Sequence, residues 1–226
     1  MADIVLGGPL AVDIFLIANG WIAQNNSDDD NDQRETGKGA DGDVIASELF
    51  GGRNDVSSVL MNFGTSGNLV LPPIGQVLGG FFLLNWNIVF NQKGWPTMTL
   101  TGHQHDQNAH VDGTLNEYSS SLVIPAGFGV PIVFAVTDSV SSYQSLTYTL
   151  EMDHEDQDDN VGEHLAGESA AGRELVEATF WGTPVFNSVI PPFNTFDLKN
   201  TVKNQSNETG AFDQTTVSWE RDLARD

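Results

Sequence analysis

Apolar and polar residues alternate with a period of two in several segments of the chain. Over residues 145–152 every second side chain is apolar, and three further segments follow the same rule. The apolar residues that would share a face are Leu146, Tyr148, Leu150 and Met152; Leu84, Trp86, Ile88 and Phe90; Met98 and Leu100; and Val217 and Trp219. Successive side chains of a β-strand point to opposite faces of a sheet, so this pattern predicts strands with one buried face.

Glycine and proline separate these segments, and helical periodicity is scarce. We expect short helices at residues 44–50 and near 164–171. Residues 25–42 and 200–210 are rich in Asp, Asn, Gly and Ser, which predicts polar loops or arms, and the acid-rich residues 153–172 are expected to form another loop. The sequence thus predicts a single all-β domain over residues 1–226, a β-sandwich or barrel with one or two short helices and long polar loops.

The chain is long enough to bury a substantial core, but its charge is unusual. Of 226 residues, 39% are hydrophobic, and 31 acidic against 9 basic residues give a net charge of −22. Nucleic-acid binding needs clustered Lys and Arg to displace counterions, so this balance argues against it. The absence of cysteine excludes disulfides, thiol catalysis and thiolate metal sites.

The acidity has two interpretations. Concentrated salt screens the self-repulsion of a strongly charged chain, so the protein is halophilic in the first interpretation. In the second, the host is ordinary or marine and the charge is confined to a few loops. Residues 28–43 contain seven acidic and two basic residues, and residues 151–177 contain ten and one, which fits the second interpretation. Both stay open.

The sequence shows no targeting signal. The apolar stretch Leu10–Ile17 contains Asp13, lacks a positively charged flank and is too short to cross a bilayer. We therefore expect a protein that is made in a cytosol, is not secreted and has no membrane partner.

Histidines form the first candidate metal site. His103 and His105 lie two residues apart at the end of a predicted strand, and His110 follows. Their imidazoles would bind a metal if a carboxylate from elsewhere joined them. The alternative is that they are loop histidines that form hydrogen bonds.

An acidic segment offers a second candidate site. Asp156, Asp158 and Asn160 have the spacing of the first three calcium ligands of an EF-hand, but Gly162 falls one position too late for that motif. Solvated loop charge is the alternative. A structural cation is the only cofactor that the sequence suggests.

Catalytic motifs are not found. The sequence contains no nucleophile elbow, no phosphate-binding loop and no zinc-protease motif, so we expect a non-enzymatic protein. Trp95, in the turn Gly94-Trp95-Pro96, is the one tryptophan expected to be exposed enough to stack on a sugar.

Six segments of the chain share one resemblance: Leu78-Gly79-Gly80-Phe81-Phe82, Trp86-Asn87-Ile88, Trp95 to His103, His164 to Glu168, Arg173 to Pro184 and Ser218 to Leu223. They resemble virion structural proteins of tailed viruses, of bacteria or archaea, and above all the major tail tube subunit. The resemblance implies a β-sandwich or barrel that self-assembles into hexameric rings, which stack into a tube in the virion tail after assembly in the host cytoplasm. Its partners would be its own copies and other virion proteins, and viral DNA would pass through without specific binding.

A tail tube gives the acidic residues a function. Carboxylates that line the lumen repel phosphate, so DNA slides without sticking. The residues expected at the lumen or between rings are Asp28, Asp29, Asp30, Asp32, Asp41 and Asp43.

Two other functions are alternatives to the tail tube. One is a capsid protein, either a jelly-roll shell subunit or a decoration protein, and the other is a carbohydrate- or cation-binding β-sandwich module.

Overall fold

The computed structural model describes residues 14–17, 20–30, 33–38, 40, 44–50, 53–105, 117–120, 122–130, 142–158, 164–181, 197–204 and 213–223. All helical or strand structure in these residues is β-strand, which confirms the predicted all-β class. The strands are β1 (Trp21–Asp30), β2 (Gln33–Lys38), β3 (Val44–Phe50), β4 (Arg53–Asn62), β5 (Val77–Leu78), β6 (Phe81–Asn91), β7 (Thr97–His105), β8 (Ser142–Asp158), β9 (His164–Trp181), β10 (Asp197–Asn204) and β11 (Gln214–Leu223).

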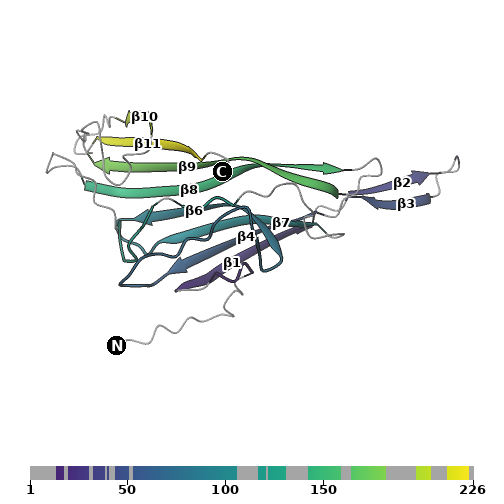
Figure 1. Cartoon of the computed structure of the whole chain (residues 1–226), viewed down its shortest axis with the longest axis horizontal. Helices are drawn as coiled ribbons and strands as arrows, with labels where there is room; N and C mark the ends of the chain where they lie inside the picture. The colour runs from purple at the N-terminus through teal and green to yellow at the C-terminus, as the bar shows by residue number, and fades with distance from the viewer. Residues whose placement is uncertain are drawn as a thin grey trace.

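Most of the strands belong to one antiparallel sheet (Figure 1). Its order is β1-β4-β7-β6-β8-β9-β11-β10, and the short β5 pairs with β6. Strands β2 and β3 form a separate two-stranded ribbon. Within the described strands the order ends at β1 and at β10, so the chain forms an open sheet with two edges and not a closed barrel.

The predicted alternation determines which side chains are buried, with one local exception. Every second residue of β8 from Leu146 to Met152 is buried, and in β6 the same holds from Trp86 to Phe90. Leu84, however, is only half-buried, and Leu83 is buried instead. A β-bulge between Leu83 and Asn85 shifts the register, which moves side chains to the other face. The prediction that Leu84 shares a face with Trp86 is therefore wrong.

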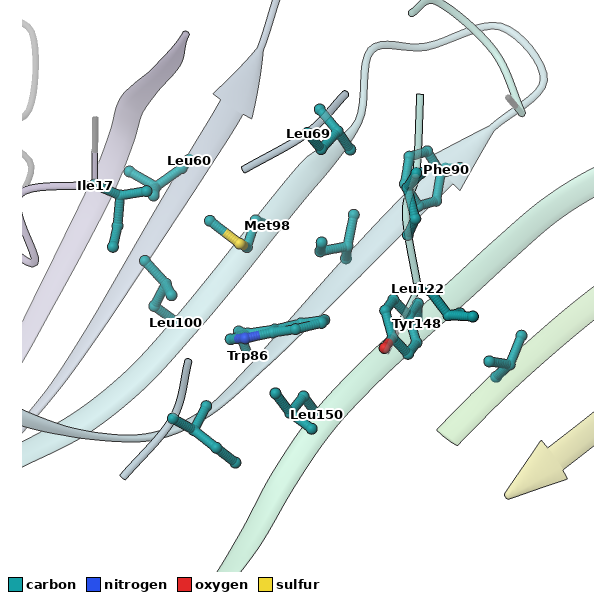
Figure 2. Packing of buried hydrophobic residues seen from close by; sticks show 14 of the residues in the cluster. Ile17, Leu60, Leu69, Trp86, Phe90, Met98, Leu100, Leu122, Tyr148 and Leu150 are labelled. Atoms are coloured by element: carbon teal, nitrogen blue, oxygen red, sulfur yellow. The ribbon is translucent and has the colours of Figure 1, made fainter. Parts of the chain in front are cut away.

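The core lies between one face of the sheet and three connecting segments. The buried hydrophobic residues that these segments contribute are Phe15, Ile17, Leu69, Ile74, Tyr118, Leu122 and Ile124. The backbone N–H of Leu69 donates to the carbonyl of Ile124 at 2.7 Å, which joins two of the segments to each other. Trp86 lies at the centre of the cluster, with Met98 and Leu100 on one side and Tyr148 and Leu150 on the other (Figure 2).

Both predicted helices are strands. Residues 44–50 form β3, which pairs with β2 from Phe50 opposite Gln33 to Val44 opposite Lys38. Residues 164–171 belong to β9, whose first residue His164 pairs with Asp158 of β8. Helix propensity is a weak preference per residue, and pairing with a neighbouring strand overrides it here.

The predicted polar loops also prove to be strands over most of their described length. Residues 25–30 continue β1 along β4, and residues 33–38 form β2. Residues 200–204 belong to β10, whereas 205–210 lie outside the described residues. Of the acidic stretch 153–172, residues 153–158 and 164–172 form the distal parts of β8 and β9, and 159–163 lie outside the described residues. Backbone hydrogen bonds to a neighbouring strand do not require apolar side chains, so a polar composition does not prevent pairing.

Candidate functional site

The two acid-rich stretches of the chain lie at the same end of the sheet. The strand pairing shows this across the sheet. Asp30 of β1 lies opposite Asn54 of β4, His103 of β7 lies opposite Phe82 of β6, and Asn85 of β6 lies opposite Glu151 of β8. Beyond Glu151, β8 and β9 continue as a two-stranded ribbon. Figure 1 shows this ribbon and the β2–β3 ribbon extending from that same end. We call it the acidic end: of the described residues it comprises 28–30, 33–38, 44–50, 153–158 and 164–169.

The predicted lumen residues fall partly in this region. Asp28, Asp29 and Asp30 occupy the last positions of β1, opposite Val56, Asp55 and Asn54 of β4. Asp32, Asp41 and Asp43 lie outside the described residues. Their place in a lumen or between rings stays a prediction.

The structure brings together a different pair of histidines from the predicted ones. His103 is buried on β7, and its ring centroid lies 5.1 Å from that of His154 on β8. Phe82 contacts both rings, at 5.7 Å and 4.9 Å between centroids. Sequence reasoning missed His154 because it lies on a distant segment of the chain and becomes a neighbour only when β8 joins the sheet.

The remaining members of the two metal hypotheses are only partly placed. His105 is the last residue of β7, opposite Arg53, and His110 lies outside the described residues. Asp156 and Asp158 lie on β8, and Asn160 lies outside the described residues. Within the part that the structure describes, no three His, Asp or Glu side chains converge as a metal site would require.

A shallow pocket of about 280 Å³ lies near the acidic half of the sheet. Ser27, Asp55, Ser57 and Thr101 contribute polar side chains to its lining, and Leu84 contributes an apolar one. A lining with one carboxylate and three hydroxyl side chains suits many small polar ligands and does not identify a particular one.

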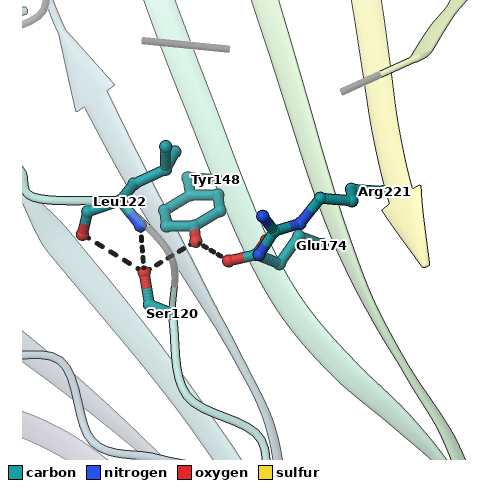
Figure 3. A network of polar contacts seen from close by, with 5 residues as sticks. All are labelled: Ser120, Leu122, Tyr148, Glu174 and Arg221. Carbon is teal, nitrogen blue, oxygen red and sulfur yellow. Dashed lines mark hydrogen bonds and ion pairs between the residues drawn. The ribbon is translucent and has the colours of Figure 1, made fainter. Parts of the chain in front are cut away.

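The most highly organised polar cluster of the described residues lies on the buried face (Figure 3). Tyr148 of β8 donates a hydrogen bond to Oε1 of Glu174 on β9. Nη2 of Arg221, on β11, lies 2.6 Å from Oε2 of the same carboxylate. Oγ of Ser120 lies 2.7 Å from the tyrosine oxygen, and the backbone N–H of Leu122 donates to Oγ at 3.1 Å. The cluster therefore joins three adjacent strands to the segment that covers the core.

Burial makes the interactions of this cluster important for the stability of the fold. The Glu174 side chain is 0% exposed, whereas that of Arg221 is 25% exposed. A buried carboxylate is stable in an apolar environment only when it is paired and hydrogen-bonded, and here each of its oxygens has a partner. The sequence contained a signal for it, because Glu174 continues the alternating series of Val176, Ala178 and Phe180 as the one charged member.

The same burial predicts an abnormal titration of Tyr148. Burial, and then the neighbouring Glu174 charge, raise the pKa of Tyr148 well above its ordinary value of 10.0. The unfolded chain would ionise this tyrosine near its ordinary pKa and the folded chain would not. Its contribution to stability is therefore complete below about pH 10 and falls as the pH rises above that value.

An alkaline titration followed by tyrosinate absorbance checks this expectation. In the native protein, Tyr148 should ionise only when the chain unfolds. The Tyr148→Phe variant should lack that late step. A variant that keeps the same late step would assign it to another tyrosine and contradict the prediction.

The part that the structure describes has no helix with the length and apolarity to cross a bilayer.

Comparison with known proteins leaves the chain without an assigned family. The sequence matches no protein-family model and no curated protein.

Proposed function

We propose that the chain is a non-enzymatic virion structural protein, the tail tube subunit of a tailed virus, whose copies form hexameric rings that stack into a conduit for DNA. The observation that carries this proposal is the open sheet with edges at β1 and β10. An edge strand presents a row of backbone N–H and C=O groups to another chain. Joining β10 of one copy to β1 of the next is a head-to-tail contact, which closes into a ring when the rotation fits.

Two further features support a structural role. The polar groups of the buried Tyr148–Glu174–Arg221 cluster pair with one another and link neighbouring strands, which stabilises the sheet as a structural subunit requires. The net charge of −22 repels phosphate oxygens, so DNA within such a tube would move without being held. The resemblance of the sequence to tail tube subunits points in the same direction.

Negative-stain electron microscopy of the purified protein tests the proposal directly. Images at ~0.15 M and ~2 M salt span the range in which screening changes most. Hollow tubes or six-membered rings are expected in at least one condition. Closed shells would favour the capsid alternative, and dispersed small particles at both salts would contradict the tube.

A variant of the β1 edge sharpens this test. Gln24 is exposed and sits at a β-bulge, where it has no partner in β4. Proline is tolerated at edge bulges, where it has no backbone N–H to donate and its ring hinders the pairing of a further strand. Gln24→Pro should therefore keep the melting temperature and abolish rings, whereas Gln24→Thr should assemble like the wild type. A ring-forming Gln24→Pro variant would exclude β1 from the contact between subunits.

A further inference from the structure

The end of the sheet opposite the acidic end carries a cluster of aromatic rings. Trp95 packs edge-on against Phe63 and Phe128, with centroids 5.7 Å and 5.4 Å away. Phe63 and Trp95 are half-buried, but Phe128 is 59% exposed. The backbone N–H of Gly129 donates to the carbonyl of Gly94 at 2.8 Å, which fixes the Phe128 loop to the turn that carries Trp95. We call these three rings the aromatic end.

This exposed ring is held in place before any partner arrives. Its loop is also fixed on the other side, where the N–H of Ala126 donates to the carbonyl of Gly67 at 2.9 Å. An apolar ring on a fixed loop loses little conformational entropy on binding, which is typical of the residues that dominate protein interfaces.

The charges along the strand direction are strongly asymmetric. Lys93 is exposed two positions before Trp95, and the register places Lys203 opposite Thr215, in the same half of the sheet. Asp213 and the exposed Glu177, which pairs with Thr147 of β8, are acidic residues in this half of the sheet, so its described charges nearly balance. The described residues of the acidic end, by contrast, include ten Asp or Glu residues against two basic ones, Arg34 and Lys38 of β2. Five of the acidic residues lie on its β8–β9 ribbon: Asp153, Glu155, Asp156, Asp158 and Glu168.

The ribbons of the acidic end would also gain stability by packing against a partner. The distal parts of β8 and β9, from His154 opposite Ser169 to Asp158 opposite His164, are paired only with each other among the described strands. The β2–β3 ribbon is likewise two-stranded. Isolated two-stranded ribbons are marginally stable in water and gain stability when they pack against another surface.

We propose that the aromatic end, Phe63, Trp95 and Phe128 with Lys93, is the docking surface for the acidic end of a second copy of the chain. Two acidic ends repel each other, whereas the lysine-bearing aromatic end attracts one. The contact is therefore head-to-tail along the strands, and repetition gives an open stack. This inference rests on the proposed tube and assigns the surfaces by which its rings stack.

Two substitutions at the aromatic end test the docking surface. Phe128→Ser removes the exposed ring, and Lys93→Glu reverses the attracting charge. Each should raise the protein concentration needed for stacking at least about tenfold, as expected for residues central to an interface. Ring diameter should not change, because Lys93 and Phe128 lie outside the edge strands β1 and β10. Val123→Ser, which alters an exposed apolar residue between Leu122 and Ile124 on the segment that covers the core, is the matched control and should stack like the wild type.

Electron microscopy and sedimentation velocity across a concentration series distinguish the outcomes. Rings that stack normally in both variants would overturn the docking surface and leave the tube proposal intact. If Phe128→Ser weakens stacking but Lys93→Glu does not, the acidic end is not the partner and the proposal fails. If the wild type forms no rings, the tube proposal fails. Phe128-dependent and Lys93-dependent end-to-end oligomers in sedimentation would still support the contact, and a wild-type monomer at every concentration would overturn it.

Discussion

Replacement of Glu174 by alanine is expected to destabilise the fold by about 3 kcal/mol. The substitution leaves the Tyr148 hydroxyl and the Arg221 guanidinium without the carboxylate that both of them contact. Removing one member of a buried ion pair costs about 3–5 kcal/mol, and we expect the lower end because Arg221 still reaches solvent. Urea denaturation followed by far-ultraviolet circular dichroism measures the change.

Two neighbouring variants give this experiment its controls. Glu174→Gln keeps an oxygen that accepts from Tyr148, so it should lose less stability than the alanine variant. Glu177→Ala, an exposed substitution on the same strand, should change stability by less than about 0.5 kcal/mol. A Glu174→Ala variant as stable as Glu177→Ala would show that the buried cluster does not stabilise the sheet.

The salt dependence of the same variants separates buried from exposed ion pairs. Salt screens buried charges much less than exposed ones, so the cost of Glu174→Ala should persist at ~2 M salt. The ion pair of Arg173 with Glu151 lies on exposed side chains, so Arg173→Ala should cost less than about 1 kcal/mol and less again at high salt. Equal salt dependence of the two variants would contradict the burial argument.

Replacement of Trp86 by alanine should cost about 3–5 kcal/mol, the largest effect that we expect from a single core substitution. Trp86 is 0% exposed, and its ring lies 5.0 Å from that of Tyr148. Its indole N–H donates to the carbonyl of Pro72 at 2.8 Å, so truncation also leaves a buried acceptor without its donor. The same urea denaturation experiment gives the size of the loss.

Two comparison variants attribute that loss to the core. Trp86→Phe keeps most of the apolar volume and loses the hydrogen bond, so it should fall between the wild type and the alanine variant. Trp95→Ala removes a half-buried ring at the aromatic end and should cost less than Trp86→Ala. If Trp95→Ala proved the more destabilising of the two, the centre of the core would lie elsewhere.

The sequence by itself determined the fold class and most of the buried face. A period of two is the local signature of a strand, and it identified Trp86, Tyr148 and Trp219 as core residues before any neighbour was known. The exception at Leu84 came from a bulge, which depends on how β6 pairs with β7 and leaves no mark in the alternation of β6 itself. The functional expectation came from resemblance and stays a proposal.

The tertiary structure decided whether the segments without a clear period form strands or helices, and which residues make up the polar clusters. Residues 44–50 and 164–171 became strands because a partner strand was available to pair with them. The Glu174 cluster combines residues of β8, β9 and β11 with Ser120, and His103 meets His154 only across strands. Local preferences are worth a fraction of a kcal/mol per residue, whereas cross-strand pairing and burial act together over many residues. Contacts between residues far apart in the sequence therefore decided what local preference left open.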